Sequence, residues 1–244
     1  EQEDAHEFLT RLLDYYSPHV CLNLHALCRF RNAPVYLCPH FACLGSTQRA
    51  AHEDNICLQL EIMERRSNSW QQRVYSLQQA VNLYETSTEV VELRDWVCPE
   101  CGLECNPRKR NSIRTCPRLL FILLKRFRGL HSELKHRVLC EDSITFGGCT
   151  YKQVARIYHR GLDLSSGHYF AICRHESRPD EYWYYDDHAR RLARESDSHT
   201  KRSRVYMCFY EKTSDGDVVV DLVHEPDSQA AVGDVVRHIQ EHGT

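Results

Sequence analysis

The residues best suited to chemistry are His168 and two consecutive aspartates, Asp186 and Asp187. His168 opens an aromatic and apolar run, and the aspartates follow the next such run, Tyr182–Tyr185. Two strands of a hairpin would place the imidazole beside a carboxylate, which can orient the ring and stabilise its protonated form. Because alternate residues of a strand point to opposite faces, one aspartate should reach His168, and we expect it to be Asp186.

A histidine–aspartate pair of this kind serves a nucleophile, and cysteine is the usual one where no serine motif is visible. The imidazole takes the thiol proton, and the thiolate attacks an acyl carbon. The chain has 13 cysteines, but none stands in a sequence typical of a nucleophile, and the chain begins at Glu1 without an initiator methionine. We therefore expect a fragment whose nucleophilic cysteine lies upstream, and which is inactive alone.

Cys98-Pro-Glu-Cys101 is typical of a metal-binding knuckle. Two thiolates three positions apart can bind one tetrahedral ion while the turn between them donates backbone N–H groups to sulfur. Gly102, directly after the second cysteine, can relieve the tight backbone there. A closed four-coordinate site needs a second pair of ligands.

Cys38-Pro-His40-Phe-Ala-Cys43 is the best candidate for that second pair. Its cysteines have four residues between them, so His40 with Cys43 is an alternative pair, and Cys105 is a possible substitute ligand. The distance between the two knuckles in sequence favours two hairpins that meet at a fingertip. We expect a structural zinc ion bound by Cys38, Cys43, Cys98 and Cys101.

The bulk composition limits the class of protein. A net charge of −3 over 244 residues argues against a general nucleic-acid binder, and no apolar run approaches the length of a membrane span. We expect a soluble protein of the cytoplasm or the nucleus, without nucleic-acid or membrane partners. An odd number of cysteines favours a reducing compartment, with core thiols at Cys57, Cys140, Cys173 and Cys208.

Hydrophobic periodicity predicts helices early in the chain and strands late, which indicates an α+β fold. One helix should follow the N-cap Asp4 and end before Pro18, and a second should run from about Trp70 to Tyr84. The acidic segment 213–244 should be a tail, with a Val218–Val220 run and a short helix near Val235–Ile239. Strands are expected at Leu119–Leu124, Val154–Tyr158, Tyr169–Cys173, Tyr182–Tyr185 and Val205–Tyr210.

Asp4 and Glu7 admit two interpretations. They can form a capping box at the start of the first helix, since carboxylates are favoured at a helix N-terminus. One turn apart, they can also offer two carboxylates to a basic peptide.

Taken together, these motifs resemble those of the ubiquitin-specific proteases, a family of cysteine peptidases. The resemblance covers about residues 1–212 and consists of several boxes in the family's order. They are the Gln-Asp-Ala box at Gln2–Leu9, the Leu-Lys-Arg-Phe strand at Cys116–Phe127, the histidine box at Tyr151–Tyr169, the aromatic-Asp-Asp box at Tyr182–Asp187 and the closing strand at Val205–Tyr210.

The resemblance implies a papain-like α+β fold shaped as a hand, with fingers at about 30–115, a palm at about 116–212 and most of the thumb missing. It implies hydrolysis of the isopeptide bond after the C-terminal glycine of ubiquitin. His168 would be the general base and Asp186 its orienting acid. Asp4 and Glu7 would pair with arginines of the ubiquitin tail, Tyr169 would line the tail channel, and the cysteine knuckles would form zinc-bearing fingertips.

The chain departs from the family pattern in three places. The nucleophile box that precedes the Gln-Asp-Ala box is absent, the first knuckle is irregular, and Cys116 replaces an apolar residue. The expected function is that of a deubiquitinating cysteine protease acting on ubiquitinated proteins. An inactive ubiquitin-binding or scaffold member of the family, and a zinc-dependent interaction module, are the alternatives.

Overall fold

The computed structural model describes residues 4–16, 24–41, 43, 45–48, 52–65, 71–73, 75–127, 133–163, 166–178, 180–198 and 203–214. The predicted tail helix near 235–239, the 218–220 run and the residues 17–23 after the first helix lie outside this part of the chain. None of the helices that the structure describes is long and apolar enough to cross a membrane.

The first helix, α1, spans Ala5–Tyr16 and confirms the predicted helix. Asp4 caps it, because its Oδ1 accepts hydrogen bonds from the backbone N–H groups of His6 (2.9 Å) and Glu7 (3.0 Å). Leu9 and Leu13 lie on the face that packs against the central sheet. A short helix, α2, follows at Leu24–Cys28.

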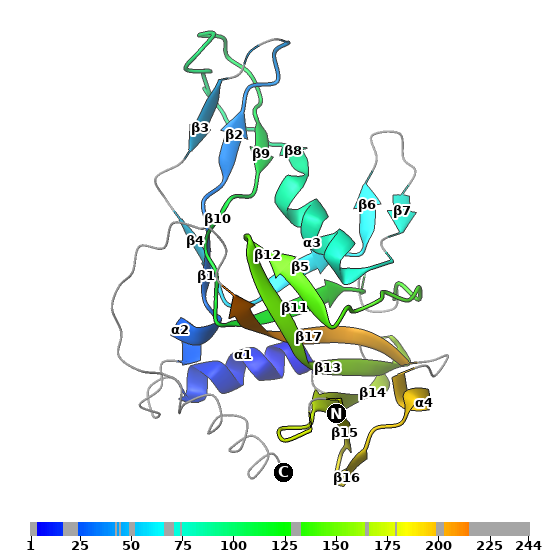
Figure 1. Cartoon of the computed structure of the whole chain (residues 1–244). Coiled ribbons are helices and arrows are strands. Elements are labelled where there is room, and N and C mark those ends of the chain that lie inside the picture. The colour runs from blue at the N-terminus through cyan, green and yellow to red at the C-terminus, as the bar shows by residue number, and fades with distance from the viewer. Residues whose placement is uncertain are drawn as a thin grey trace.

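A large antiparallel sheet forms the body of the described chain (Figure 1). Its strand order is β16-β15-β14-β13-β17-β11-β5, with β12 paired to β13; only β5 joins in parallel, against β11. The strands are β5 (Leu58–Glu61), β11 (Leu119–Lys125), β12 (Ser143–Phe146), β13 (Cys149–Asp163), β14 (Ser166–Arg174), β15 (Tyr182–Asp186), β16 (Ala189–Leu192) and β17 (Ser203–Ser214), with α4 (Glu195–Ser198) before the last.

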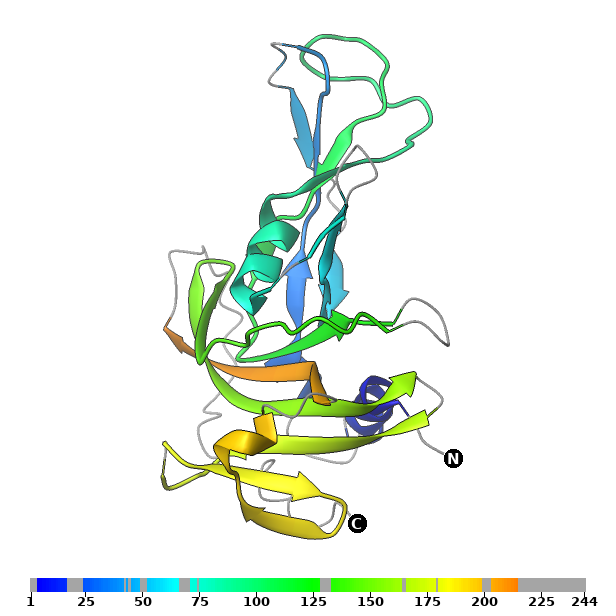
Figure 2. The same ribbon diagram turned by 90° about the vertical axis from the view of Figure 1, so that its right-hand side faces the viewer.

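Both faces of this sheet are covered. Along β11, Leu120, Ile122 and Leu124 pack into the larger core on the side of helix α3 (Leu77–Thr86), while Phe121 and Leu123 pack on the side of α1. Figure 2 shows the two helices on opposite sides of the sheet. The continuous apolar run at 119–124 is therefore a strand buried on both faces, as predicted.

The strands of this sheet extend beyond their predicted bounds. The run 154–158 is the centre of β13, which covers Cys149–Asp163, and the run 205–210 is the centre of β17, which ends at Ser214. Their ends contain polar residues, which hydrophobic periodicity does not mark. Antiparallel pairing with both neighbours, rather than side-chain pattern, extends β13 to this length.

A narrow arm rises from the sheet and ends in two loops (Figure 1). Its sheet has the order β3-β2-β9-β8, and a second sheet, β10-β1-β4, lies at its base. The two loops at its tip are residues 38–45 and 91–107. The strands of the two sheets are β1 (Phe30–Asn32), β2 (Val35–Leu37), β3 (Ser46–Gln48), β4 (Glu53–Asn55), β8 (Thr88–Val90), β9 (Arg108–Arg110) and β10 (Ile113–Thr115).

The prediction of a second helix over residues 70–84 is wrong for the first turns of that range. Helix α3 spans Leu77–Thr86, and Gln71–Arg73 instead forms strand β7, which pairs with β6 (Met63–Arg65). Ser76 sets the boundary, because its side chain accepts a 3.1 Å hydrogen bond from the N–H of Gln79. Early helices and late antiparallel strands nevertheless confirm the α+β class.

Candidate active site and metal centre

His168 and Asp186 meet at one edge of the central sheet. His168 is the third residue of β14 and Asp186 is the last residue of β15, and the two strands pair antiparallel. The His168 Nε2 atom is hydrogen-bonded to Oδ1 of Asp186. Asp187 also lies within 4.8 Å in this group, but it has a positive φ of 49° in the turn to β16, and the carboxylate bonded to the ring is that of Asp186. The structure thus brings together the pair that the sequence predicts.

Tyr184 holds the other oxygen of this carboxylate. Its hydroxyl donates a 2.5 Å hydrogen bond to Asp186 Oδ2, and Arg160 approaches the same hydroxyl at 3.5 Å. Partial burial alone would raise the pKa of Asp186, but the hydrogen bonds from Tyr184 and His168 outweigh it and lower that pKa. Asp186 is therefore ionised at neutral pH and can hold the imidazole in one orientation.

With Nε2 held by Asp186, Nδ1 of His168 is the ring nitrogen that can accept a proton from a nucleophile. Among the described residues, the side chains grouped with His168 within 4.8 Å are Asp186 and Asp187, and this group contains no thiol. Burial raises the pKa of Cys28 and Cys57 to about 12 and that of Cys173 to about 11. These three thiols are therefore poor nucleophiles at neutral pH.

Gly167, directly before His168, lies within β14 and pairs with Gly161 on β13. A Cβ atom at Gly167 would lie 2.3 Å from Nε2 of His159, a side chain that is fully buried. The close approach of β14 to His159 requires glycine here, and it fixes the backbone that carries His168.

Asp4 is joined to the sheet by two tyrosines. Tyr206 donates a 2.6 Å hydrogen bond to Asp4 Oδ2, and Tyr169 lies 3.4 Å from the same oxygen. Burial and the nearby Asp4 carboxylate raise the pKa of both phenols. Asp4 thus caps α1 with one oxygen and anchors the helix to β14 and β17 with the other, while Tyr169 remains half-buried.

Glu7 lies on the exposed side of α1. Its carboxylate forms a 2.6 Å ion pair with Arg11, one turn further along, and its side chain is 55% exposed. The capping-box interpretation holds for Asp4 rather than for Glu7, since the structure records Asp4 as the acceptor of both N-terminal N–H groups. Glu7 is therefore the more accessible of the two carboxylates.

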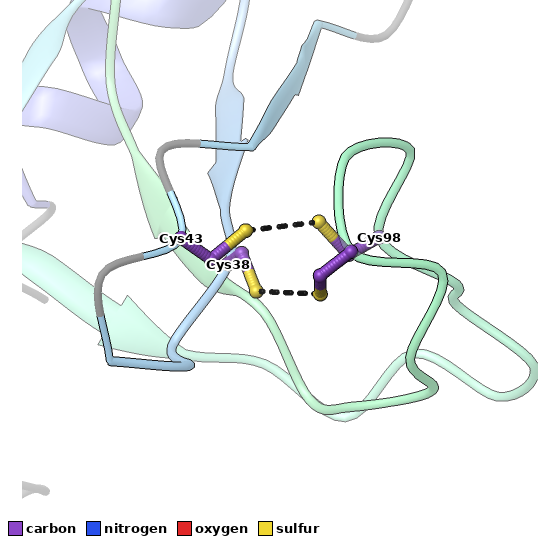
Figure 3. A group of neighbouring side chains, drawn as sticks. Cys38, Cys43 and Cys98 are labelled. Atoms are coloured by element: carbon purple, nitrogen blue, oxygen red, sulfur yellow. Dashed lines mark hydrogen bonds between the residues drawn. The ribbon is translucent and has the colours of Figure 1, made fainter.

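The four predicted cysteine ligands converge at the tip of the arm (Figure 3). Cys38 Sγ lies 3.8 Å from Cys101 Sγ, and Cys43 Sγ lies 3.6 Å from Cys98 Sγ. Four thiolates placed about 2.3 Å from one tetrahedral ion stand about 3.8 Å from each other. The donor set and its spacing therefore fit a closed tetrahedral metal site.

Backbone N–H groups donate to sulfurs of the cluster, among them those of Cys43 and Cys98. The N–H of Gly45 donates to Cys43 Sγ at 3.4 Å, and the N–H of Cys101 lowers the pKa of Cys98 to about 7. A Cβ at Gly45 would lie 2.4 Å from Cys98 Sγ, so glycine is needed for the two loops to meet. Gly102 has a φ of +68°, as expected for the tight backbone after the second cysteine.

The alternative ligands lie beside the same cluster. His40 Nδ1 is 3.3 Å from Cys38 Sγ and 3.6 Å from Cys101 Sγ. Cys38, His40 and Cys105 also form a second group of candidate ligand atoms. The four-cysteine group has one thiolate for each corner of a tetrahedron and needs neither His40 nor Cys105.

Two of the four thiols expected in the core lie there. Cys140 and Cys208 are buried and lie with their sulfurs 3.4 Å apart. Cys57 and Cys173 are partly exposed instead.

Sequence reasoning missed the residues that support the site. Tyr184 stands two positions before Asp186 on a strand, a spacing that places both on one face and could have identified it. Tyr206 and Asp4 are 202 positions apart, and no sequence signal links them.

Comparison with known proteins identifies relatives of this chain. A family model described as "Ubiquitin carboxyl-terminal hydrolase" matches residues 1–210. "Ubiquitin carboxyl-terminal hydrolase 10" of Saccharomyces cerevisiae is 30% identical over 158 residues, which cover 59% of this chain and 19% of the relative. The human "Ubiquitin carboxyl-terminal hydrolase 3" is 23% identical over 259 residues, covering 86% of this chain and 48% of the relative. The chain thus spans half or less of the length of these relatives.

Solved structures share the fold. A SAGA Ubp8/Sgf11/Sus1/Sgf73 DUB module bound to ubiquitin aldehyde contains a chain that matches with a TM-score of 0.69 at 17% identity, covering 87% of this chain and 50% of that one. The Ubp8-Sgf11-Sgf73-Sus1 SAGA DUB module matches with a TM-score of 0.65 at 16% identity, covering 88% and 49%. These matches confirm the expected papain-like α+β fold.

Proposed function

Because the chain belongs to the ubiquitin carboxyl-terminal hydrolase family, we propose that it is part of the catalytic domain of a deubiquitinating cysteine protease. The substrate bond is the isopeptide after the C-terminal glycine of ubiquitin, in ubiquitinated proteins. The observation that carries the proposal is the hydrogen-bonded pair of His168 and Asp186. Tyr184 donates a hydrogen bond to the second oxygen of the Asp186 carboxylate.

His168 acts as the general base in this proposal. Its Nδ1 removes the proton from a cysteine thiol, while Asp186 holds the N–H at Nε2 and stabilises the imidazolium. The thiolate attacks the carbonyl carbon of the glycine, and the imidazolium then protonates the departing lysine amine. Water, activated by the same imidazole, hydrolyses the resulting thioester and frees the thiol.

The attacking thiol comes from outside the described residues, in a segment ahead of Glu1 in the parent protein. In support, burial raises the pKa values of Cys28, Cys57 and Cys173, and the thiol with a lowered pKa, Cys98, belongs to the cluster at the arm tip. On this proposal the 244-residue chain alone does not hydrolyse ubiquitin conjugates.

The ubiquitin tail contacts the surface around α1. Glu7 offers an exposed carboxylate to a basic side chain of the tail, and Asp4 adds negative charge one turn before it. Tyr169, half-buried and held near Asp4, lines the channel. Ubiquitin is thus the proposed partner, and the cytoplasm or the nucleus the proposed compartment.

Zinc is the proposed metal at the arm tip. Four thiolates close the coordination sphere and leave no position for a reacting water, so the ion would supply stability rather than chemistry. Cys38 and Cys43 fix one loop and Cys98 and Cys101 fix the other. The ion would set the shape of the arm, with no part in proton transfer at His168.

The proposal is tested on the parent protein with ubiquitin that carries a thiol-reactive electrophile at its C-terminus, read by mass. One added ubiquitin on an upstream cysteine, with labelling slowed by more than about 100-fold in His168→Ala, supports it. Asp187→Asn is the comparison variant and should slow labelling far less, because the His168 ring is bonded to Asp186. Reversible ubiquitin binding without an adduct would instead identify an inactive ubiquitin-binding member of the family.

A further inference from the structure

A cationic cavity of about 420 Å³ lies beside β13 and β17, away from the His168–Asp186 pair. The described residues that line it include four arginines and no aspartate or glutamate. Arg204 is bound to Glu133 at 3.0 Å just outside the wall. The arginines of the wall are Arg126, Arg137, Arg156 and Arg204.

Arg126 is a buried cation whose hydrogen bonds all go to carbonyl groups, and the Glu133 carboxylate is near enough to raise its pKa. Its guanidinium is almost fully buried and donates to the carbonyl oxygens of Val205 (2.5 Å), Leu134 (3.0 Å) and His136 (2.9 Å). Burial lowers the pKa of Arg126 to about 10. A buried cation that is bonded to carbonyl groups favours a nearby anion, because its charge is poorly screened there.

Two further donors in the wall are buried and have no hydrogen-bond partner among the described residues. They are Nε of Arg156 and the hydroxyl of Tyr158. Tyr158 is 1% exposed, and its ring stacks on Phe170 at 4.8 Å with an interplanar angle of 3°, which fixes the direction of the hydroxyl. Buried polar groups are nearly always hydrogen-bonded, so two adjacent donors without an acceptor indicate a missing acceptor.

The two residues that carry these donors line this cavity. Arg156 and Tyr158 stand two positions apart on β13, so they share one face of the sheet. Arg160, the next residue on that face, is the one that pairs with His168 across the strands. Two-residue steps along a strand are about 7 Å, which places Arg156 about 13 Å from Arg160 and separates the two sites.

We propose that this cavity binds a phosphoryl group, supplied as free phosphate or on a phosphorylated side chain of a partner. A guanidinium group can donate two parallel hydrogen bonds to the oxygens of a phosphate, and several guanidinium groups together favour a doubly charged anion. The volume of the cavity exceeds that of one phosphate. Tyr75 (57% exposed) and Leu139 (64% exposed) lie at its rim and can form apolar contacts with a molecule that carries the phosphoryl group. This site goes beyond the proposed peptidase function and does not depend on it.

The test is calorimetric titration of the intact protein at low salt with sodium phosphate, with a short phosphoserine peptide and with the same peptide unphosphorylated. Arg156→Gln removes the guanidinium charge together with the Nε–H, and Tyr158→Phe removes the hydroxyl donor alone. Arg114→Gln on β10 removes the same charge far from the cavity and is the matched control. A hydrogen bond to a charged group is strong enough that each cavity variant should raise Kd at least about tenfold, while the control leaves it unchanged.

Tyr158→Phe separates a binding role from a structural one. Removing a hydroxyl that lacks a partner should leave the melting temperature of the unliganded protein equal or higher, while the stabilisation by phosphate falls. Tighter binding of the phosphopeptide than of phosphate identifies a protein partner; equal binding identifies a free anion. Absence of phosphate and phosphopeptide binding to wild type, or wild-type affinity in both cavity variants, would overturn the proposal.

Discussion

The hydroxyl of Tyr184 donates a 2.5 Å hydrogen bond to Oδ2 of Asp186, so both carboxylate oxygens have partners: the tyrosine on one side and His168 on the other. Tyr184 is itself fixed, since the Arg191 guanidinium covers its ring at 4.1 Å and Phe170 packs against it at 5.2 Å. The orientation of the proposed base therefore depends on an aromatic residue that does not touch it.

Tyr184→Phe tests this dependence in the parent enzyme. The substitution keeps the packed ring and removes the donor that is aimed at Asp186, so the carboxylate and then His168 lose their fixed orientation. We expect kcat to fall about tenfold with KM changed less than about twofold, because a charged hydrogen bond contributes about 1.5–3 kcal/mol. Steady-state hydrolysis of a ubiquitin C-terminal amide measures both constants.

Tyr185→Phe is the control for that substitution. Tyr185 lies on the opposite face of β15, and its buried hydroxyl has no hydrogen-bond partner among the described residues. Its loss should leave kcat unchanged. Wild-type kcat in Tyr184→Phe would show that Asp186 is held without this hydrogen bond.

Asp186 should make stability depend on pH. Its pKa in the folded protein is lowered, so its stabilising contribution is complete above the unfolded value of about 3.9 and is lost as the pH falls through the folded value. Asp186→Asn should therefore reduce the free energy of unfolding at pH 7 and have a shrinking effect as the pH falls below about 4. Urea unfolding across this range measures the difference. An equal effect at every pH would show that packing, rather than charge, stabilises this residue.

The elements that the sequence predicts best are those in which local signals agree. Helix α1 has a capping aspartate and helical spacing of its apolar residues, and its bounds match the prediction. The His168–Asp186 contact follows from the order of two strands in one hairpin. The bond from Tyr206 to Asp4 could not be predicted, since it depends on how β17 packs against a helix 202 positions earlier. The cavity arginines likewise come from distant positions: Arg156 and Arg204 lie on β13 and β17, and Arg126 and Arg137 lie outside the strands.

The start of α3 shows where local pattern misleads. The apolar spacing continues back to about residue 70, but Ser76 caps the helix and residues 71–73 pair as a strand. Ser76→Ala should cost about 1 kcal/mol in the free energy of unfolding, because it leaves the N–H of Gln79 without its acceptor. Chemical denaturation measures this loss. Thr86, near the other end of the helix, is the matched position: Thr86→Ala should cost less than half as much.

The choice of metal ligands can be tested by substitution at the arm tip. Cys98→Ser should abolish stoichiometric zinc binding, since Cys98 is buried within the four-thiolate group. Cys105→Ser and His40→Ala should retain one zinc per chain, because they remove side chains from the second group only. Elemental analysis gives the stoichiometry. Loss of zinc in Cys105→Ser would move the site to the group that contains His40.

Removal of the metal should act locally. Chelation should loosen the two loops at the arm tip and leave the His168–Asp186 contact intact, because the central sheet carries that pair. Imidazole signals in NMR spectra of the protein with and without chelator measure this. A shift of the His168 signals on chelation would show that the arm is coupled to the sheet.

Glu7 and Asp4 should respond differently to neutralisation. Glu7 is exposed and its carboxylate pairs with Arg11 one turn away, so Glu7→Gln should weaken ubiquitin binding and change the free energy of unfolding by less than about 0.5 kcal/mol. Tyr206→Phe removes the anchor of Asp4 and should destabilise the protein by about 2 kcal/mol, since a buried phenol loses its bond to a carboxylate. Urea unfolding and ubiquitin titration of both variants separate the two roles. Unchanged ubiquitin affinity in Glu7→Gln would remove Glu7 from the proposed tail site, and unchanged stability in Tyr206→Phe would show that α1 is held by its apolar face alone.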